Sequence, residues 1–168
     1  MSAGIDFDQA NAAQKLMRRF AASGPGSWLF VRVLHHIDRP VFRLTRGRHT
    51  VASLLSGIPV VMLTTTGAKS GRPRSVPLLG VPDGDTVAII GSNFGQGHHP
   101  AWVHNLRSDP SAEITVNGVS QRVRAVEADD TRRAAIWQRG LQVYPGFDQY
   151  ERRASHRRIS VFVLEPAA

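Results

Sequence analysis

Two turn signals, each lying between two stretches typical of β-strands, constrain the fold of this 168-residue chain more than any other feature. They are the dipeptides Asp83-Gly84 and Asn117-Gly118. Such pairs are typical of the two-residue turns of β-hairpins, because Gly and Asn adopt a positive φ at low cost. The sequence therefore predicts two antiparallel hairpins.

The remaining pattern adds strands and helices around these hairpins. Apolar runs predict two further strands, at 58–66 and 157–166. Helical spacing of apolar residues predicts three helices, at 7–22, 99–110 and 129–145. Asp129 or Asp130 is expected to cap the last helix. Because no series of strand–helix–strand units occurs, we expect an α+β fold, mainly an antiparallel β-barrel with flanking helices.

The part of the chain before the strands has a different texture. Residues 1–57 are expected to form an N-terminal helical and amphipathic extension, with the barrel at 58–168, and the whole to make one structural domain. Residues 28–48 mix apolar groups with Arg and His, and could rest on an anionic membrane surface or pack as a helix on the barrel. No apolar run approaches the roughly 20 residues that span a bilayer, and the start lacks a secretory signal. We expect a cytoplasmic protein, with peripheral contact to the inner face of the cell membrane as an option.

The distribution of charge points to an anionic partner. The net charge is +8, and no acidic residue lies between Asp38 and Asp83. The basic residues of that block are Arg39, Arg43, Arg46, Arg48, Lys69, Arg72 and Arg74. Their positive potential should attract nucleic acid, an anionic membrane surface or a small polyanionic ligand. The absence of cysteine excludes disulfides, thiolate catalysis and cysteine-ligated metal sites.

Part of this charge lies in GAKSGRPR, at 67–74, between two predicted strands. The stretch lacks the G-x-x-x-x-G-K-[ST] spacing of a phosphate-binding P-loop. Gly67 and Gly71 would nevertheless let backbone N–H groups converge, and Lys69, Arg72 and Arg74 would add charged donors. The stretch can therefore hold phosphate or carboxylate groups. The alternative is a solvated basic turn between strands.

Three segments in order resemble the deazaflavin-dependent nitroreductase family of actinobacteria, whose members use coenzyme F420. They are IPVVMLTTTGAKSGRPRSVPLLGV, GSNFGQGHHPAWVHNLRSDP and YPGFDQY. The resemblance runs from about Ile58 to Pro166. It implies a split β-barrel, a fold shared with flavin-binding proteins of the pyridoxamine-phosphate-oxidase type. It also implies F420 as the cofactor, with FMN as the alternative.

The same resemblance implies which residues hold the deazaflavin. Its phosphate and oligoglutamate tail would contact Lys69, Ser70, Gly71, Arg72 and Arg74. Its ring edge and the wall of its site would be formed by Thr65, Pro77, Leu78, Leu79, Pro100, Trp102 and Asn105. Backbone N–H groups would reach the ring or the phosphate from Ile90, Gly91, Ser92, Asn93 and Phe94. Structural alternatives are strand propensity for Thr65, the core for Trp102 and bracing of a turn for Asn105.

Catalytic roles fall on Ser92, Tyr144 and Tyr150. Ser92 could donate a hydrogen bond to a substrate oxygen as hydride arrives, or simply satisfy a backbone group at a strand end. The resemblance implies that Tyr144, Phe147 and Tyr150 wall a substrate pocket over the deazaflavin, where a tyrosine hydroxyl can donate a proton. The alternative is that these aromatic residues only pack onto the barrel.

The leading hypothesis is an F420-dependent oxidoreductase that transfers a hydride from reduced deazaflavin to a small acceptor such as a quinone or a nitroaromatic. The alternative is a non-catalytic carrier or sensor of the same fold that binds a deazaflavin or flavin. We expect no nucleic acid partner, because only the charge favours one and no recognition motif is present. We expect no metal, because adjacent residues such as His98 and His99 seldom ligate one ion. The oligomeric state is left open.

Overall fold

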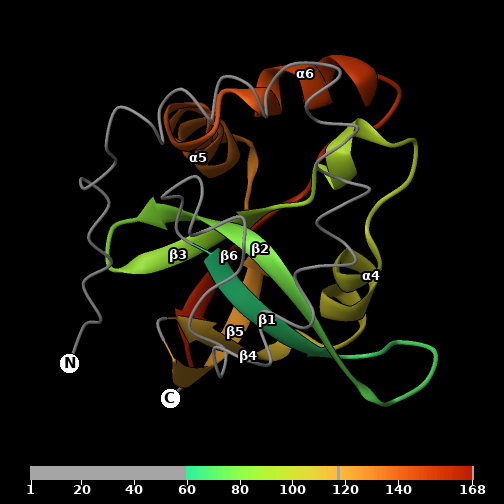
Figure 1. The fold of residues 1–168 in the computed structure, drawn as a ribbon, viewed down its shortest axis with the longest axis vertical. Helices are drawn as coiled ribbons and strands as arrows, with labels where there is room; N and C mark the ends of the chain where they lie inside the picture. Colours follow the sequence, from blue (N-terminus) through green and yellow to red (C-terminus); the bar gives the residue numbers. More distant parts are fainter. Residues whose placement is uncertain (1–59, 117, 168) are drawn as a thin grey trace.

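Six antiparallel strands form one closed barrel in the computed structural model, which describes residues 60–116 and 118–167 (Figure 1). The strands are β1 (Val60–Thr66), β2 (Pro73–Asp83), β3 (Thr86–Ile90), β4 (Ser111–Val116), β5 (Val119–Glu127) and β6 (Val161–Pro166). The described helices are the short 3-10 helix η1 (Asn93–Gly95), α4 (Ala101–Ser108), α5 (Asp130–Val143) and α6 (Gly146–Arg153). The predicted antiparallel barrel with flanking helices is confirmed. The expected extension at 1–57, with its helix at 7–22 and its amphipathic segment at 28–48, lies outside the described residues.

Both predicted hairpins form. β2 and β3 pair out to Asp83 and Thr86, with Gly84 at φ 61° in the turn. β4 and β5 pair out to Val116 and Val119 around the second turn. The order of strands around the barrel is β1-β2-β3-β6-β5-β4. The last strand of the chain therefore lies between the two hairpins and joins them.

β3 and β6 are buried on both faces over residues 87–90 and 161–164, which explains why these four-residue runs are apolar throughout. On β3, Val87 and Ile89 face an apolar cluster inside the barrel, whereas Ala88 and Ile90 face a second cluster that includes residues of α5 and α6. β6 alternates between the same two clusters. β5 instead buries Val123 and Ala125 and leaves its other residues exposed, so its outer face meets solvent.

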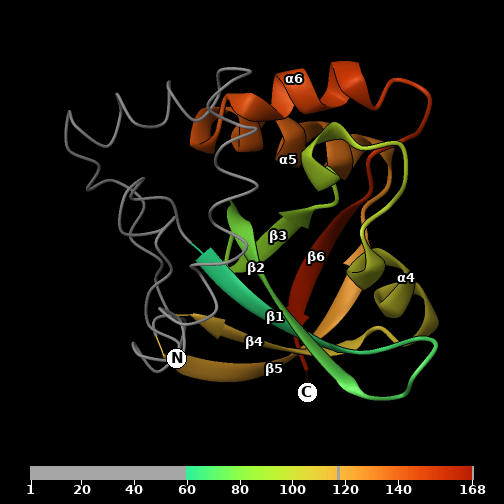
Figure 2. The same ribbon diagram turned by 45° about the vertical axis from the view of Figure 1, so that its right-hand side comes forward.

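The helices cover this core from two sides (Figure 2). α5 and α6 lie next to each other over one side of the barrel. Their apolar residues complete the second cluster, the one that Ala88 and Ile90 face and that is called the outer cluster below. α4 adds Trp102, Val103 and Leu106 to the inner cluster. α5 begins where the Asp129 carboxylate accepts a hydrogen bond from the Arg132 N–H at 2.8 Å, so the first of the two candidate caps is confirmed.

α6 is an element that the sequence analysis does not predict. The pattern ends the preceding helix near Pro145 and treats YPGFDQY only as an aromatic motif before the last strand. In the structure α5 ends at Val143, and a second helix begins immediately after Pro145. The proline ring prevents the first helix from continuing, but its φ of −58° suits the start of a new one.

Replacing Gly95 with Ala tests how closely η1 packs against α6. Gly95 has φ +77°, and a Cβ there would lie 2.8 Å from the Cβ of Arg153 and 3.0 Å from the carbonyl oxygen of Tyr150. We expect Gly95→Ala to lower the free energy of unfolding by about 2–4 kcal/mol, because a left-handed φ and overpacking act together. Urea denaturation measures the loss.

Gly84→Ala is the matched control for that variant. Gly84 has φ +61°, and a Cβ there would have no neighbour within 4 Å. Only the backbone cost should remain, about 1–2 kcal/mol. Equal losses in the two variants would contradict the close contact between η1 and α6.

Candidate functional site

The segments that carry the predicted cofactor residues lie along one side of the barrel. Both views show the β1–β2 turn, α4, η1 and α6 following one another on this side (Figure 1, Figure 2). α4 contacts both the β1–β2 turn and the loop that follows β3, because Asn105 bonds to the turn and Val103 lies against Gly91. Segments that are far apart in the sequence are thereby brought next to one another.

The β1–β2 turn, residues 67–72, uses most of its backbone N–H groups within the protein. The N–H groups that donate internally are those of Gly67, Ala68, Ser70, Gly71 and Arg72. The φ of 62° at Gly71 permits this tight turn. The expected convergence of N–H groups on a ligand therefore does not apply to these five residues, and the donors for an anion at this turn come mainly from side chains.

Lys69, Arg72 and Arg74 supply those side chains. All three residues are exposed, as is Ser70 beside them. Within the described residues, the ion pairs all lie elsewhere. Because no described carboxylate neutralises these cations, their charge is available to a polyanion.

Asn105 braces the turn, which is the structural alternative that the sequence offers for this residue. Its side-chain oxygen accepts a hydrogen bond from the Ala68 N–H at 3.0 Å. Its side-chain nitrogen donates to the hydroxyl of Thr65 at 3.0 Å. Asn105 and Thr65 are both buried. One residue of α4 thus fixes the end of β1 and the start of the basic turn.

Asn105→Ala should loosen the β1–β2 turn. The variant leaves the Ala68 N–H and the buried Thr65 hydroxyl without their partner, so we expect a loss of about 1–3 kcal/mol in the free energy of unfolding. Urea denaturation measures it. Gln142→Ala, at an exposed position of α5, is the control and should change stability by less than about 0.5 kcal/mol. A loss no larger than that of the control would contradict the bracing role.

Loop 91–96 follows β3 and has an unusual backbone. Ser92 lies in the right-handed helical region, at φ −65° and ψ −33°, and Asn93 and Phe94 follow with φ of 48° and 56°. A right-handed residue followed by a left-handed one turns successive N–H groups to one side and forms a nest for an anionic oxygen. Among the described residues, no acceptor bonds to the N–H groups of residues 92–94.

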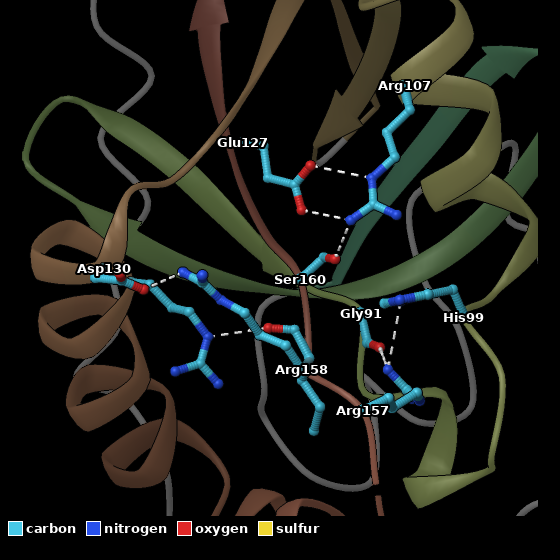
Figure 3. A network of polar contacts seen from close by, with 10 residues as sticks. Gly91, His99, Arg107, Glu127, Asp130, Arg157, Arg158 and Ser160 are labelled. Carbon is cyan, nitrogen blue, oxygen red and sulfur yellow. Dashed lines mark hydrogen bonds and ion pairs between the residues drawn. The ribbon is translucent and has the colours of Figure 1, made fainter.

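Arg157, which precedes β6, contacts this loop through its guanidinium group (Figure 3). Its Nη2 donates to the carbonyl of Ser92 at 2.8 Å and its Nε to the carbonyl of Gln96 at 2.9 Å. Its Nη1 lies 3.3 Å from the carbonyl oxygen of Gly91. One side chain therefore holds the loop at its beginning and at its end.

The hydroxyl of Ser92 makes no hydrogen bond to a backbone group at the end of β3. Its residue is 8% exposed, and the hydroxyl makes no hydrogen bond within the described part of the chain. The backbone carbonyl of Ser92, by contrast, accepts from Gly95 and from Arg157. The strand-end alternative is therefore not observed, and the hydroxyl can donate to a ligand oxygen.

Tyr144, at the end of α5, packs against Phe147 and Tyr150 of α6. Their residues are 8%, 3% and 6% exposed. The two tyrosine hydroxyls lie 3.1 Å apart, and the rings of Tyr144 and Phe147 meet edge to face at 5.5 Å. Burial raises the pKa of both phenols. In this structure the three aromatics are part of the core, as the alternative interpretation has it, and their role as a substrate wall stays a prediction.

A titration can test this burial, because Tyr144 and Tyr150 are the two tyrosines of the chain. Burial raises the pKa of each above its ordinary value of 10. Tyrosinate absorbance should therefore be absent from the native protein at about pH 10 and appear there in the unfolded protein. A raised pKa stabilises the fold fully below the unfolded pKa, so the free energy of unfolding should fall as the pH rises above about 10. Native titration at the ordinary pH would contradict the buried pair.

The remaining predicted residues differ in exposure. Trp102 is buried with its ring centroid 5.9 Å from that of Phe162, which confirms that it belongs to the core. Ile90 and Gly91 are buried. Leu78, Leu79 and Pro100 are half-buried, and Pro77 is exposed.

A cavity of about 460 Å³ lies among α4, the start of α5 and the start of β6, and none of the predicted site residues is in its wall. Its wall includes an ion pair in which Arg107 Nη2 lies 2.7 Å from a carboxylate oxygen of Glu127 and donates to the Ser160 hydroxyl at 2.9 Å (Figure 3). The Arg107 hydrogen bond lowers the pKa of Glu127. Burial, followed by the charge of Arg157, lowers the pKa of His99, which also lines the cavity. Because its arginines are paired with carboxylates, the cavity suits a polyanion less than the basic turn does.

Sequence reasoning missed Arg157. The residue stands in RRASHRRIS, where nothing distinguishes it from the other arginines. Its role arises because β6 pairs with β3, so that the Gly91 N–H donates to the Ser160 carbonyl at 2.8 Å. Only the strand order brings this segment to loop 91–96.

Residues 60–116 and 118–167 contain neither a metal-binding cluster nor a membrane-spanning helix. No group of three or more His, Asp or Glu side chains there is arranged to hold a metal ion. None of the described helices is both long enough and apolar enough to cross a membrane.

Comparison with known proteins identifies a family. The family model described as F420H(2)-dependent quinone reductase matches residues 37–166. Rv3178 of Mycobacterium tuberculosis, whose name proposes F420H(2)-dependent quinone reductase activity, is 33% identical over 109 residues, which are 65% of this chain and 91% of that protein. A solved structure of an F420-H2 dependent reductase, FDR-A, is 32% identical with a TM-score of 0.59, over 64% of this chain and 94% of that one. Another solved structure, described as a domain-swapped dimer, is 28% identical with a TM-score of 0.61, over 84% of this chain and 100% of that one.

Proposed function

The chain belongs to the F420H(2)-dependent quinone reductase family, and from this membership we infer that it is an oxidoreductase that uses coenzyme F420. When bound, the reduced cofactor supplies a hydride, which together with a proton converts a quinone to the hydroquinone. The protein contributes binding, orientation and control of protons. A nitroaromatic is a second acceptor that we propose for the same site.

The residues of this chain fit a polyanionic cofactor. The observation that carries the assignment is the group of exposed cations on the β1–β2 turn, Lys69, Arg72 and Arg74, which have no ion-pair partner among the described residues. We propose that they hold the phosphate and the oligoglutamate tail, with Ser70 and Gly71 beside them. The ring would lie toward loop 91–96, where backbone N–H groups are available.

Protons would be handled by hydroxyl groups near that loop. The hydroxyl of Ser92 would donate a hydrogen bond to the acceptor oxygen on which negative charge develops. Tyr144 and Tyr150, whose pKa values are raised by burial, stay neutral at neutral pH, so they can donate a hydrogen bond but do not act as bases. The half-exposed Phe94 packs edge-on against Tyr150 at 5.9 Å and lies between this aromatic cluster and solvent.

The burial of Tyr144, Phe147 and Tyr150 favours one alternative function. With these rings in the core, the chain could bind a deazaflavin, or FMN, as a carrier or sensor without a substrate wall. We also propose that the barrel is a split β-barrel of the kind found in FMN-binding proteins. Turnover with a quinone decides between enzyme and carrier.

We also propose that the protein is cytoplasmic and contacts the membrane peripherally through residues 28–48. Support comes from the mixture of apolar residues with Arg and His in that segment and from the lipid solubility of many quinones. Co-sedimentation with anionic vesicles measures the contact. Equal pelleting of the full chain and of an Arg43→Glu, Arg46→Glu variant would contradict it.

Lys69→Ala and Arg74→Ala should each weaken F420 binding by about 3- to 10-fold, because each removes one charged contact worth about 1 kcal/mol at an exposed site. Titration followed by F420 fluorescence measures the change, with FMN as a parallel competitor. The losses should shrink at high salt, because screening weakens exposed charge interactions. Arg152→Ala, at an exposed position of α6 that pairs with Asp148, is the control and should bind as the wild type does.

The same samples test catalysis. A quinone added to reduced F420 and catalytic amounts of the wild type should restore the absorbance of oxidised F420. Binding of F420 without reoxidation by quinones or nitroaromatics would favour the carrier. Binding of FMN but not F420 would contradict both the cofactor and the role of the basic turn.

A further inference from the structure

We propose that Arg157 is a positioning residue that holds loop 91–96 so that its N–H groups at 92–94 form a nest for an oxygen atom of F420. The identity of this ligand rests on the proposed function. The position of Arg157 does not, because it is set by hydrogen bonds from one guanidinium group to three carbonyl oxygens of the loop.

Peptide geometry converts these carbonyl contacts into an orientation of N–H groups. In a trans peptide, the C=O of one residue and the N–H of the next point in opposite directions. Arg157 holds the carbonyls of Gly91 and Ser92, at 3.3 and 2.8 Å. The N–H groups of Ser92 and Asn93 therefore point away from the guanidinium, toward the other side of the loop.

The loop needs this support because its backbone is strained. Asn93 and Phe94 have φ of 48° and 56°, a region that L side chains seldom occupy. Two bonds inside the loop help to keep it, from the Gly95 N–H to the Ser92 carbonyl and from the Gln96 N–H to the Asn93 carbonyl, each at 2.9 Å. Without Arg157 we expect the loop to relax and the nest to open.

The nest suits a strongly polar or anionic oxygen, because three N–H groups in sequence can share one acceptor. Because the tail carboxylates are assigned to the basic turn, F420 leaves two kinds of oxygen for the nest, on its phosphate and on the carbonyls of its ring. Arg157 lies on the opposite side of the peptides that it holds, so it acts through the loop and not on the ligand.

Only arginine can make this set of contacts. Its planar group presents several donors in a fixed fork, whereas lysine presents one nitrogen. Arg157→Lys therefore keeps the charge and loses the fork. Arg152→Lys is the matched control, because Arg152 is exposed on α6 and pairs with Asp148 at 3.0 Å.

Hydrogen exchange resolved to single amides, on the full chain with and without oxidised F420, tests the proposal. In the free protein, Arg157→Lys should speed exchange at Gly95 and Gln96 by about tenfold or more, because their bonds depend on the loop conformation. Arg152→Lys should leave it unchanged. F420 should slow exchange at 92–94 in the wild type and the control, and less in Arg157→Lys, whose affinity for F420 should fall by about 5- to 10-fold.

The outcomes separate this inference from the proposed function. Unchanged exchange at Gly95 and Gln96 in Arg157→Lys would overturn the inference. Wild type that binds F420 without slower exchange at 92–94 would also overturn it, even if Arg157→Lys does not fold. Wild type that binds no F420 would overturn the proposed function and the ligand, while the free-protein comparison still decides whether Arg157 holds the loop.

A second ligand distinguishes the two oxygens. A deazaflavin with the ring and the ribityl chain but no phosphate should protect 92–94 if the nest takes a ring carbonyl. Protection by F420 alone would assign the nest to the phosphate.

Discussion

The two-sided burial of β3 and β6 is the constraint on which the rest of the structure depends. One face of each strand fills the barrel and the other must be covered, so α5 and α6 have to lie over them. The pairing of β3 with β6 also brings the end of β3 beside the start of β6, where the Gly91 N–H bonds to the Ser160 carbonyl. The loop that follows β3 and the arginine that precedes β6 are therefore neighbours by construction.

The candidate site uses two different ways to hold an anion. The β1–β2 turn uses its backbone donors for its own shape and for the bond to Asn105, and offers exposed positive charges through its side chains. In loop 91–96 the backbone, not the side chains, offers the donors. Arg157 holds the carbonyls of the loop, and no described residue accepts from the N–H groups at 92–94, so these remain available to a ligand. Side-chain cations suit a flexible charged tail, whereas a fixed nest suits one defined oxygen. This division matches a cofactor with a rigid ring and a long anionic tail.

Local signals predict much of this fold. The Asp-Gly and Asn-Gly pairs predict both hairpins, and the apolar runs predict β1 and β6, because these features act over a few residues. α6 is not predicted, since a proline can end one helix and begin another. The basic turn is recognised from its composition, but the bond from its Ala68 N–H to Asn105, 37 residues away, could not be read from neighbouring sequence. The role of Arg157 could not be predicted from the sequence for the same reason, because its partners are defined by strand order and not by neighbouring sequence.

A crystal structure of the chain with oxidised F420 would test the central claim most directly. The account predicts the oligoglutamate tail beside Lys69, Arg72 and Arg74, and an oxygen of the cofactor within hydrogen-bond distance of the N–H groups at 92–94. It predicts Arg157 still on the far side of loop 91–96, holding the carbonyls of Gly91 and Ser92. F420 bound instead in the cavity lined by Arg107, Glu127 and Ser160 would contradict the assignment of the site.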